Sequence, residues 1–96
     1  MADLQTIAAT VKQALAEDFR PVRILDVTVE EDADADGMPV LRIDVVYEGT
    51  VHDLDARKLV GAVGLLRPRL AAIDVATFPL LTFISRADIR PRALAS

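Results

Sequence analysis

The residues best suited to binding a metal ion are three alternating aspartates, Asp32, Asp34 and Asp36, followed by Gly37. This is the first half of an EF-hand loop, in which carboxylates and a sharp glycine turn surround calcium. The second half does not follow, because Ile43 stands where the closing glutamate would be. Aspartate and glycine also favour tight turns. We therefore expect a hairpin turn with no specific calcium site, and we predict no metal or other cofactor for the chain.

The only histidine, His52, lies beside Asp53 and near Asp55. A histidine with a carboxylate partner can act as a general base or bind a metal ion. The spacing pairs no nucleophile with it, since Ser85 falls in a predicted strand and Ser96 is the last residue. We expect His52 to be an exposed residue at the entry to a helix. A small-molecule enzyme that uses His52 with Asp53 or Asp55 is the second alternative function.

Gly61 and Gly64 form a GxxG spacing. RNA-binding KH domains use this spacing to bring the backbone close to phosphates. The two residues between the glycines are apolar, and the nearest basic side chains are Lys58 and Arg67. We therefore expect the glycines to allow close packing of a helix.

Composition predicts one small folded domain. The chain has 96 residues, of which 52% are hydrophobic and 27% charged, as is usual for globular proteins. The absence of cysteine excludes disulfides, thiolate catalysis and cysteine-based zinc or iron–sulfur sites. The first residues do not resemble a signal peptide, and no apolar run approaches the roughly 18 residues of a membrane span. We expect a single cytoplasmic domain over 1–96, without membrane association.

Charge is unevenly distributed along this small acidic chain, whose net charge is −4. Residues 26–55 hold ten acidic groups against one arginine, whereas residues 56–96 hold seven basic groups against two acidic ones. Such a division can orient a partner. The candidate basic surface consists of Arg57, Lys58, Arg67, Arg69, Arg86, Arg90 and Arg92.

Two helices are expected to position these groups. Apolar residues at helical spacing predict a first helix that Asp3 caps and that ends before Pro21. Asp53 is expected to cap a second amphipathic helix. Its interior glycines and Pro68 weaken it, which predicts a break near Gly64 or a restart at Pro68.

Alternation predicts the first two strands. In the first, Leu25, Val27 and Val29 should share the buried side. The acidic stretch 31–37 should form the loop of an antiparallel hairpin. In the second strand the buried side should carry Leu41, Ile43, Val45 and Tyr47.

The last strand, residues 78–84, is apolar on both sides. Two helices can cover only one of them, and monomers seldom leave a large apolar patch bare. Pro79 places this strand at an edge or at its own beginning. We predict a homodimer whose contact includes this strand. The candidate protein interface is Phe78, Leu80, Leu81, Phe83 and Ile84.

Leu41–Val46 is followed by Asp53 and Asp55, and Ser85 is followed by Arg90 and Pro91. With the order of elements, these regions resemble the N-terminal domain of the ribosome maturation factor RimP family. The resemblance implies binding to a component of the small ribosomal subunit, without catalysis.

The sequence thus predicts an α+β domain of order α-β-β-α-β, with a three-stranded sheet, both helices on one face and a loose tail from about residue 90. The expected function is a non-enzymatic module that binds protein or associates with itself. The first alternative is an RNA- or ribosome-associated domain that uses the candidate basic surface. The low aromatic content, 4%, counts against that alternative because base stacking usually requires aromatic rings.

Overall fold

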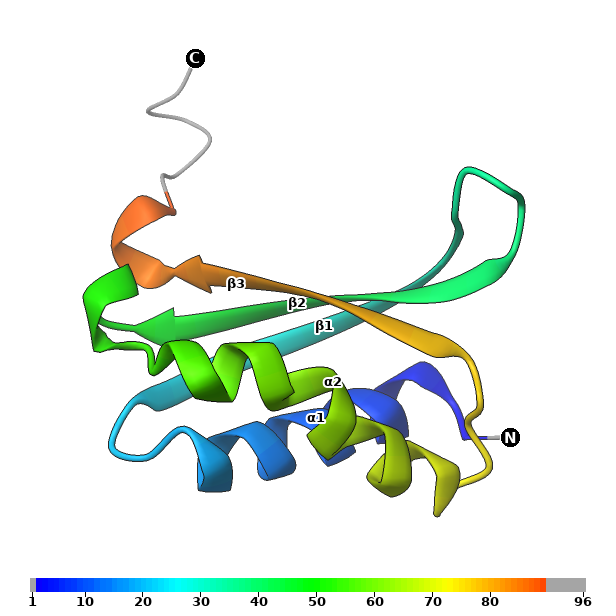
Figure 1. Cartoon of the computed structure of the whole chain (residues 1–96), viewed down its shortest axis with the longest axis horizontal. Coiled ribbons are helices and arrows are strands. Elements are labelled where there is room, and N and C mark those ends of the chain that lie inside the picture. Colours follow the sequence, from blue (N-terminus) through cyan, green and yellow to red (C-terminus); the bar gives the residue numbers. More distant parts are fainter. Residues whose placement is uncertain (1, 90–96) are drawn as a thin grey trace.

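A computed structural model describes residues 2–89, which form a sheet with a layer of helices on one side (Figure 1). The elements are α1 (Leu4–Asp18), β1 (Arg23–Ala33), β2 (Pro39–Glu48), the 3-10 turn η1 (Val51–Asp53), α2 (Ala56–Ala71), β3 (Phe78–Ser85) and the 3-10 turn η2 (Arg86–Asp88). The predicted α+β class and α-β-β-α-β order are confirmed. No helix among residues 2–89 is long and apolar enough to cross a membrane. The tail predicted from about residue 90 lies outside the described residues.

The sheet has the order β1-β2-β3, so β1 and β3 are its two edges. β1 and β2 pair antiparallel, as the predicted hairpin requires, whereas β3 pairs parallel to β2. A parallel neighbour needs a long crossover, and α2 supplies it. Figure 1 shows α1 and α2 on the same side of the sheet, and no α-helix formed by residues 2–89 covers the opposite side.

The core lies between the helices and the facing side of the sheet. Leu41, Ile43, Val45 and Tyr47 all point into it, as predicted, with at most 4% of each exposed. The helices meet them with residues at helical spacing. Among these are Ile7, Val11, Leu15, Ala62, Leu66 and Leu70.

The first helix matches its prediction. The Asp3 carboxylate accepts a hydrogen bond from the Thr6 backbone N–H at 2.8 Å. Hydrogen bonding to the backbone and side chain of Thr6 lowers the pKa of Asp3. The helix ends at Asp18, before Pro21.

The predicted orientation of Leu25 is wrong, because β1 contains a bulge. The register with β2 shifts between Ile24 and Asp26, so β1 has an extra residue and the period of two is interrupted. Ile24 therefore turns into the core, where 8% of it is exposed, and Leu25 is only half-buried. Val27 and Val29 are buried as predicted.

The acidic loop is shorter than predicted. β1 continues through Ala33, which pairs with Pro39. Arg42 Nη1 lies 3.5 Å from Asp32 Oδ2 and offsets part of the negative charge on this stretch. Only the tip remains as a turn, with Gly37 at φ 81°, a conformation that favours glycine.

The predicted break in the second helix is also wrong. α2 runs without interruption from Ala56 to Ala71 and contains Pro68. Its buried residues hold it against the core, and this packing outweighs the poor helix propensity of glycine and proline. Asp53 is not the cap of this helix. The cap is Asp55, whose carboxylate accepts the Arg57 backbone N–H at 2.9 Å, whereas the Asp53 carboxylate belongs to the capping box of η1, where it accepts the backbone N–H of the N-cap Thr50.

Candidate protein interface

The side of the sheet without helices is called the open face here, and its residues form three parallel columns. The strand registers place Asp32, Val40 and Phe78 side by side, one from each strand, and every second residue along the strands forms a further row of three in the same way. The β1 column is Asp26, Thr28, Glu30 and Asp32; the β2 column is Val40, Arg42, Asp44 and Val46; the β3 column is Phe78, Leu80, Thr82 and Ile84.

The five candidate interface residues fall on both sides of β3. Phe78, Leu80 and Ile84 lie in the open face, and 43% of both Phe78 and Leu80 is exposed. Leu81 and Phe83 point to the helices, and the Phe83 ring centroid is 5.3 Å from that of Phe19. Leu81, Phe83 and Ile84 are nevertheless only half-buried. All five side chains therefore remain incompletely covered at this edge of the sheet.

Two shallow apolar grooves occupy the ends of the open face. The first is lined by Met38, Val40, Phe78 and Leu80 together with the hairpin and residues 76–77. The second is lined by Leu25, Asp26, Val46, Arg86 and Ile89. In Figure 1 the hairpin loop and η2 lie at opposite ends of this side of the sheet.

Sequence reasoning missed the apolar residues that complete these grooves. Val40 and Val46 occupy outward positions of β2, where the other outward residues, Arg42 and Asp44, are charged. That departure from polar alternation was a usable signal. Leu25 could not be found, because alternation does not reveal the bulge that turns it outward.

Charge on the open face is mainly negative. Asp26, Glu30 and Asp32 carry it along β1, and Asp44 adds to it in β2. Arg42 is the one basic side chain in the three columns, and it pairs with Asp32. The face therefore changes from apolar at β3 to acidic at β1.

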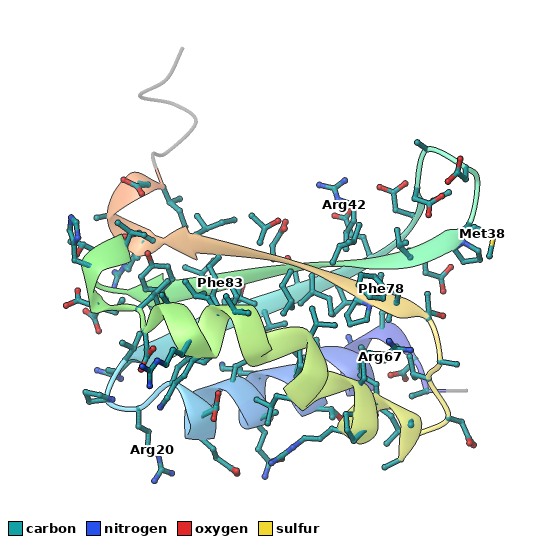
Figure 2. All side chains as sticks on the ribbon, in the orientation of Figure 1. Arg20, Met38, Arg42, Arg67, Phe78 and Phe83 are labelled. Atoms are coloured by element: carbon teal, nitrogen blue, oxygen red, sulfur yellow. The ribbon has the colours of Figure 1, made fainter. Side chains whose placement is uncertain are left out.

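The predicted basic residues are dispersed over the described part of the chain. Lys58 Nζ donates a hydrogen bond to the Asp18 carbonyl at 2.5 Å, and Arg69 Nη2 lies 3.9 Å from Glu17 Oε2. The Arg67 guanidinium carbon is 5.9 Å from the centre of the Phe78 ring (Figure 2). Arg57 is in the first turn of α2, whereas Arg86 lines a groove of the open face. Arg90 and Arg92 lie outside the described residues.

His52 is exposed in η1, between residues that support the backbone. The Asp53 carboxylate accepts the Thr50 backbone N–H at 2.7 Å. Asp55 caps α2 through Arg57. Both aspartates that could have assisted His52 thus have a structural role, because each carboxylate accepts a backbone N–H at the start of a helical segment.

We expect His52→Ala to change the free energy of unfolding by less than about 0.5 kcal/mol, because the side chain is exposed. Asp53→Ala should cost about 1 kcal/mol, since it removes a cap. Urea denaturation followed by circular dichroism compares the two. A larger loss of stability for His52→Ala than for Asp53→Ala would contradict the assignment of the structural role to Asp53.

The acidic motif at the tip of the hairpin also has a local structural role. Asp34 Oδ1 accepts the backbone N–H groups of Asp36 and Met38, both at 2.9 Å, as an aspartate in a turn does. Among residues 2–89, no group of three or more acidic or histidine side chains is placed to hold a metal ion.

Gly61 and Gly64 lie inside α2, and an added Cβ on either would meet nothing within 4 Å. The predicted close packing at these glycines is therefore wrong.

Two further polar groups stay engaged within the fold. The Ser85 hydroxyl donates to the Gly49 carbonyl and accepts the Ala87 backbone N–H at 3.2 Å. Burial raises the pKa of Tyr47, and the nearby carboxylates of Asp88 and Asp53 raise it further. The phenol therefore stays protonated at neutral pH.

Comparison with family models, curated proteins and solved structures finds no match to this chain.

Proposed function

We propose that this chain is a non-enzymatic protein-binding module that associates with itself through the free edge of β3. The observation that supports this most is the incomplete burial of apolar side chains on both sides of one edge strand. Phe78 and Leu80 are exposed on one side, and Leu81 and Phe83 are half-buried on the other. A partner packed on one side would cover only half of these residues, whereas a strand added at the edge extends both sides of the sheet.

Two-fold symmetry suits this edge. β3 of one copy can pair antiparallel with β3 of the next, so the same surface serves both subunits. Pro79 has no N–H to donate, but it is the second residue of β3 and leaves Leu80–Ser85 for pairing. The acidic β1 strands then lie at the two outer edges, because β1 is at the opposite edge from β3. This arrangement keeps the like charges apart.

Leu80→Glu is expected to convert the dimer to a folded monomer. A charge on an edge strand opposes pairing. Leu80 is the first residue of the segment left for pairing, and it is exposed enough to accept a polar group without loss of the fold. Multi-angle light scattering should give a dimer mass for the unchanged chain and a monomer mass for the variant.

Val60→Glu is the matched control, because Val60 is 87% exposed on α2 and should leave the dimer intact. Circular dichroism checks that both variants are folded. A monomer mass for the unchanged chain at high micromolar concentration would overturn self-association. A folded Leu80→Glu dimer would overturn the assignment to this edge.

A further inference from the structure

We infer that the open face binds a basic, amphipathic helix of a different protein, with the apolar side of that helix on β3 and its lysines and arginines towards β1. The face offers complementary chemistry in its two outer columns, with the β2 column between them. Phe78, Leu80 and Ile84 present apolar surface along β3, and Asp26 and Glu30 present carboxylates along β1. Charge complementarity of this kind fixes both the choice and the orientation of a partner.

A second copy of the open face does not provide this complement. With a two-fold axis parallel to the strands, the apolar β3 column of each copy would lie on the acidic β1 column of the other. With the axis perpendicular to the strands but in the plane of the interface, the two acidic columns would face each other, and like-charge juxtaposition is costly. The edge contact proposed above uses neither arrangement, so it leaves the open face of both copies available.

The dimensions of the face suit one helix. Three strands span about 10 Å, which is close to the diameter of a helix with its side chains. From Phe78 to Ile84 the strand advances about 20 Å, the length of about 13 helical residues. The two grooves lie at the ends of this distance. The first is beside Phe78, and the second lies between Val46 and Ile89, with Asp26 and Arg86 also in its lining. Apolar side chains about four turns apart on one helix would reach Phe78 in the first groove and Ile89 in the second, and a basic side chain beside the latter would lie near Asp26.

A synthetic peptide of about 18 residues, long enough to cover the face as a helix, tests the inference. It contains leucine at helical spacing on one side and lysine on the other, and it carries a fluorophore for anisotropy. The peptide should bind the folded protein, and a rise in salt should weaken binding because exposed charges are screened. A peptide of the same composition in scrambled order should bind at least tenfold more weakly, because it has no apolar side.

Two double variants with equal net charge locate the site. Asp26→Asn with Glu30→Gln removes carboxylates from the open face, and we expect the dissociation constant to rise about fivefold. Glu17→Gln with Asp18→Asn removes the same charge from the C-terminal end of α1 and should leave the dissociation constant unchanged. Equal losses in both would show attraction to overall charge and overturn the inference. So would no binding, or equal binding of the scrambled peptide.

This inference rests on the proposed protein-binding function, yet the two fail separately. Light scattering on the peptide complex reports the number of protein copies. A bound dimer supports both proposals, and a bound monomer overturns self-association alone. Peptide binding that splits a dimer into monomers would show that the dimer itself uses the open face. This result would overturn the claim that self-association uses the β3 edge while the open face binds the helix.

Discussion

Phe83→Asp is expected to remove much of the stability of the domain, whereas Leu80→Glu, three positions away in the same strand, is expected to leave the stability nearly unchanged. The difference follows from the side of β3 that each residue occupies. Phe83 points to the helices (Figure 2), and its ring centroid lies 5.3 Å from that of Phe19. Loss of a fully buried phenylalanine costs about 3–5 kcal/mol, and because Phe83 is half-buried we expect the lower end of this range. The introduced carboxylate adds a desolvation cost. Small domains have a total stability of about 5–15 kcal/mol, so this loss consumes much of it.

Urea denaturation monitored by circular dichroism tests the contrast. Phe83→Asp should show a large fall in the unfolding midpoint or no folded baseline, and Leu80→Glu should keep a cooperative transition. Phe83→Leu is the conservative control, because it retains an apolar side chain and should recover most of the stability. An unchanged midpoint for Phe83→Asp would contradict the orientation of β3. The same contrast decides which variants can test self-association, since a substitution at Phe83 would disrupt the fold as well as the edge.

Periodicity predicted the order of elements because burial imposes it on the sequence. Along β2 the buried Ile43 and Val45 lie on either side of the charged Asp44, and Val11 and Leu15 recur at helical spacing in α1, so each buried side could be identified. The apolar character of β3 also indicated an incompletely covered strand. These predictions depend on local spacing, which a single sequence displays directly.

Predictions failed where tertiary contacts overrode local preference. The bulge in β1 moves Leu25 to the open face, and nothing in the spacing of β1 marks it. The parallel pairing of β3 depends on the path of α2 across the sheet. The acidic β1 column and the apolar β3 column come to lie on one face, on either side of β2, only through the strand registers, so the candidate site could not be assembled from the sequence. The candidate basic residues share composition but not position, because Arg69 and Arg67 contact different parts of the chain.

The uninterrupted α2 helix leads to the second large effect, an increase in stability. Gly61→Ala and Gly64→Ala are each expected to raise the free energy of unfolding by about 1 kcal/mol, and by about 2 kcal/mol together. Both positions are exposed, and a new Cβ meets nothing within 4 Å. Alanine also reduces the conformational freedom of the unfolded chain.

Gly49→Ala is the opposing control, with an expected loss of about 1–3 kcal/mol. Gly49 has φ 123°, and an added Cβ would lie 2.6 Å from Asp53 Oδ2, the atom that caps η1 through Thr50. Urea denaturation should therefore move the midpoint in opposite directions for the two kinds of glycine. A loss of stability in the Gly61→Ala, Gly64→Ala double variant would contradict a continuous exposed helix. It would instead favour a bent or loop-like conformation at these glycines, which is the conformation that a GxxG motif for RNA requires.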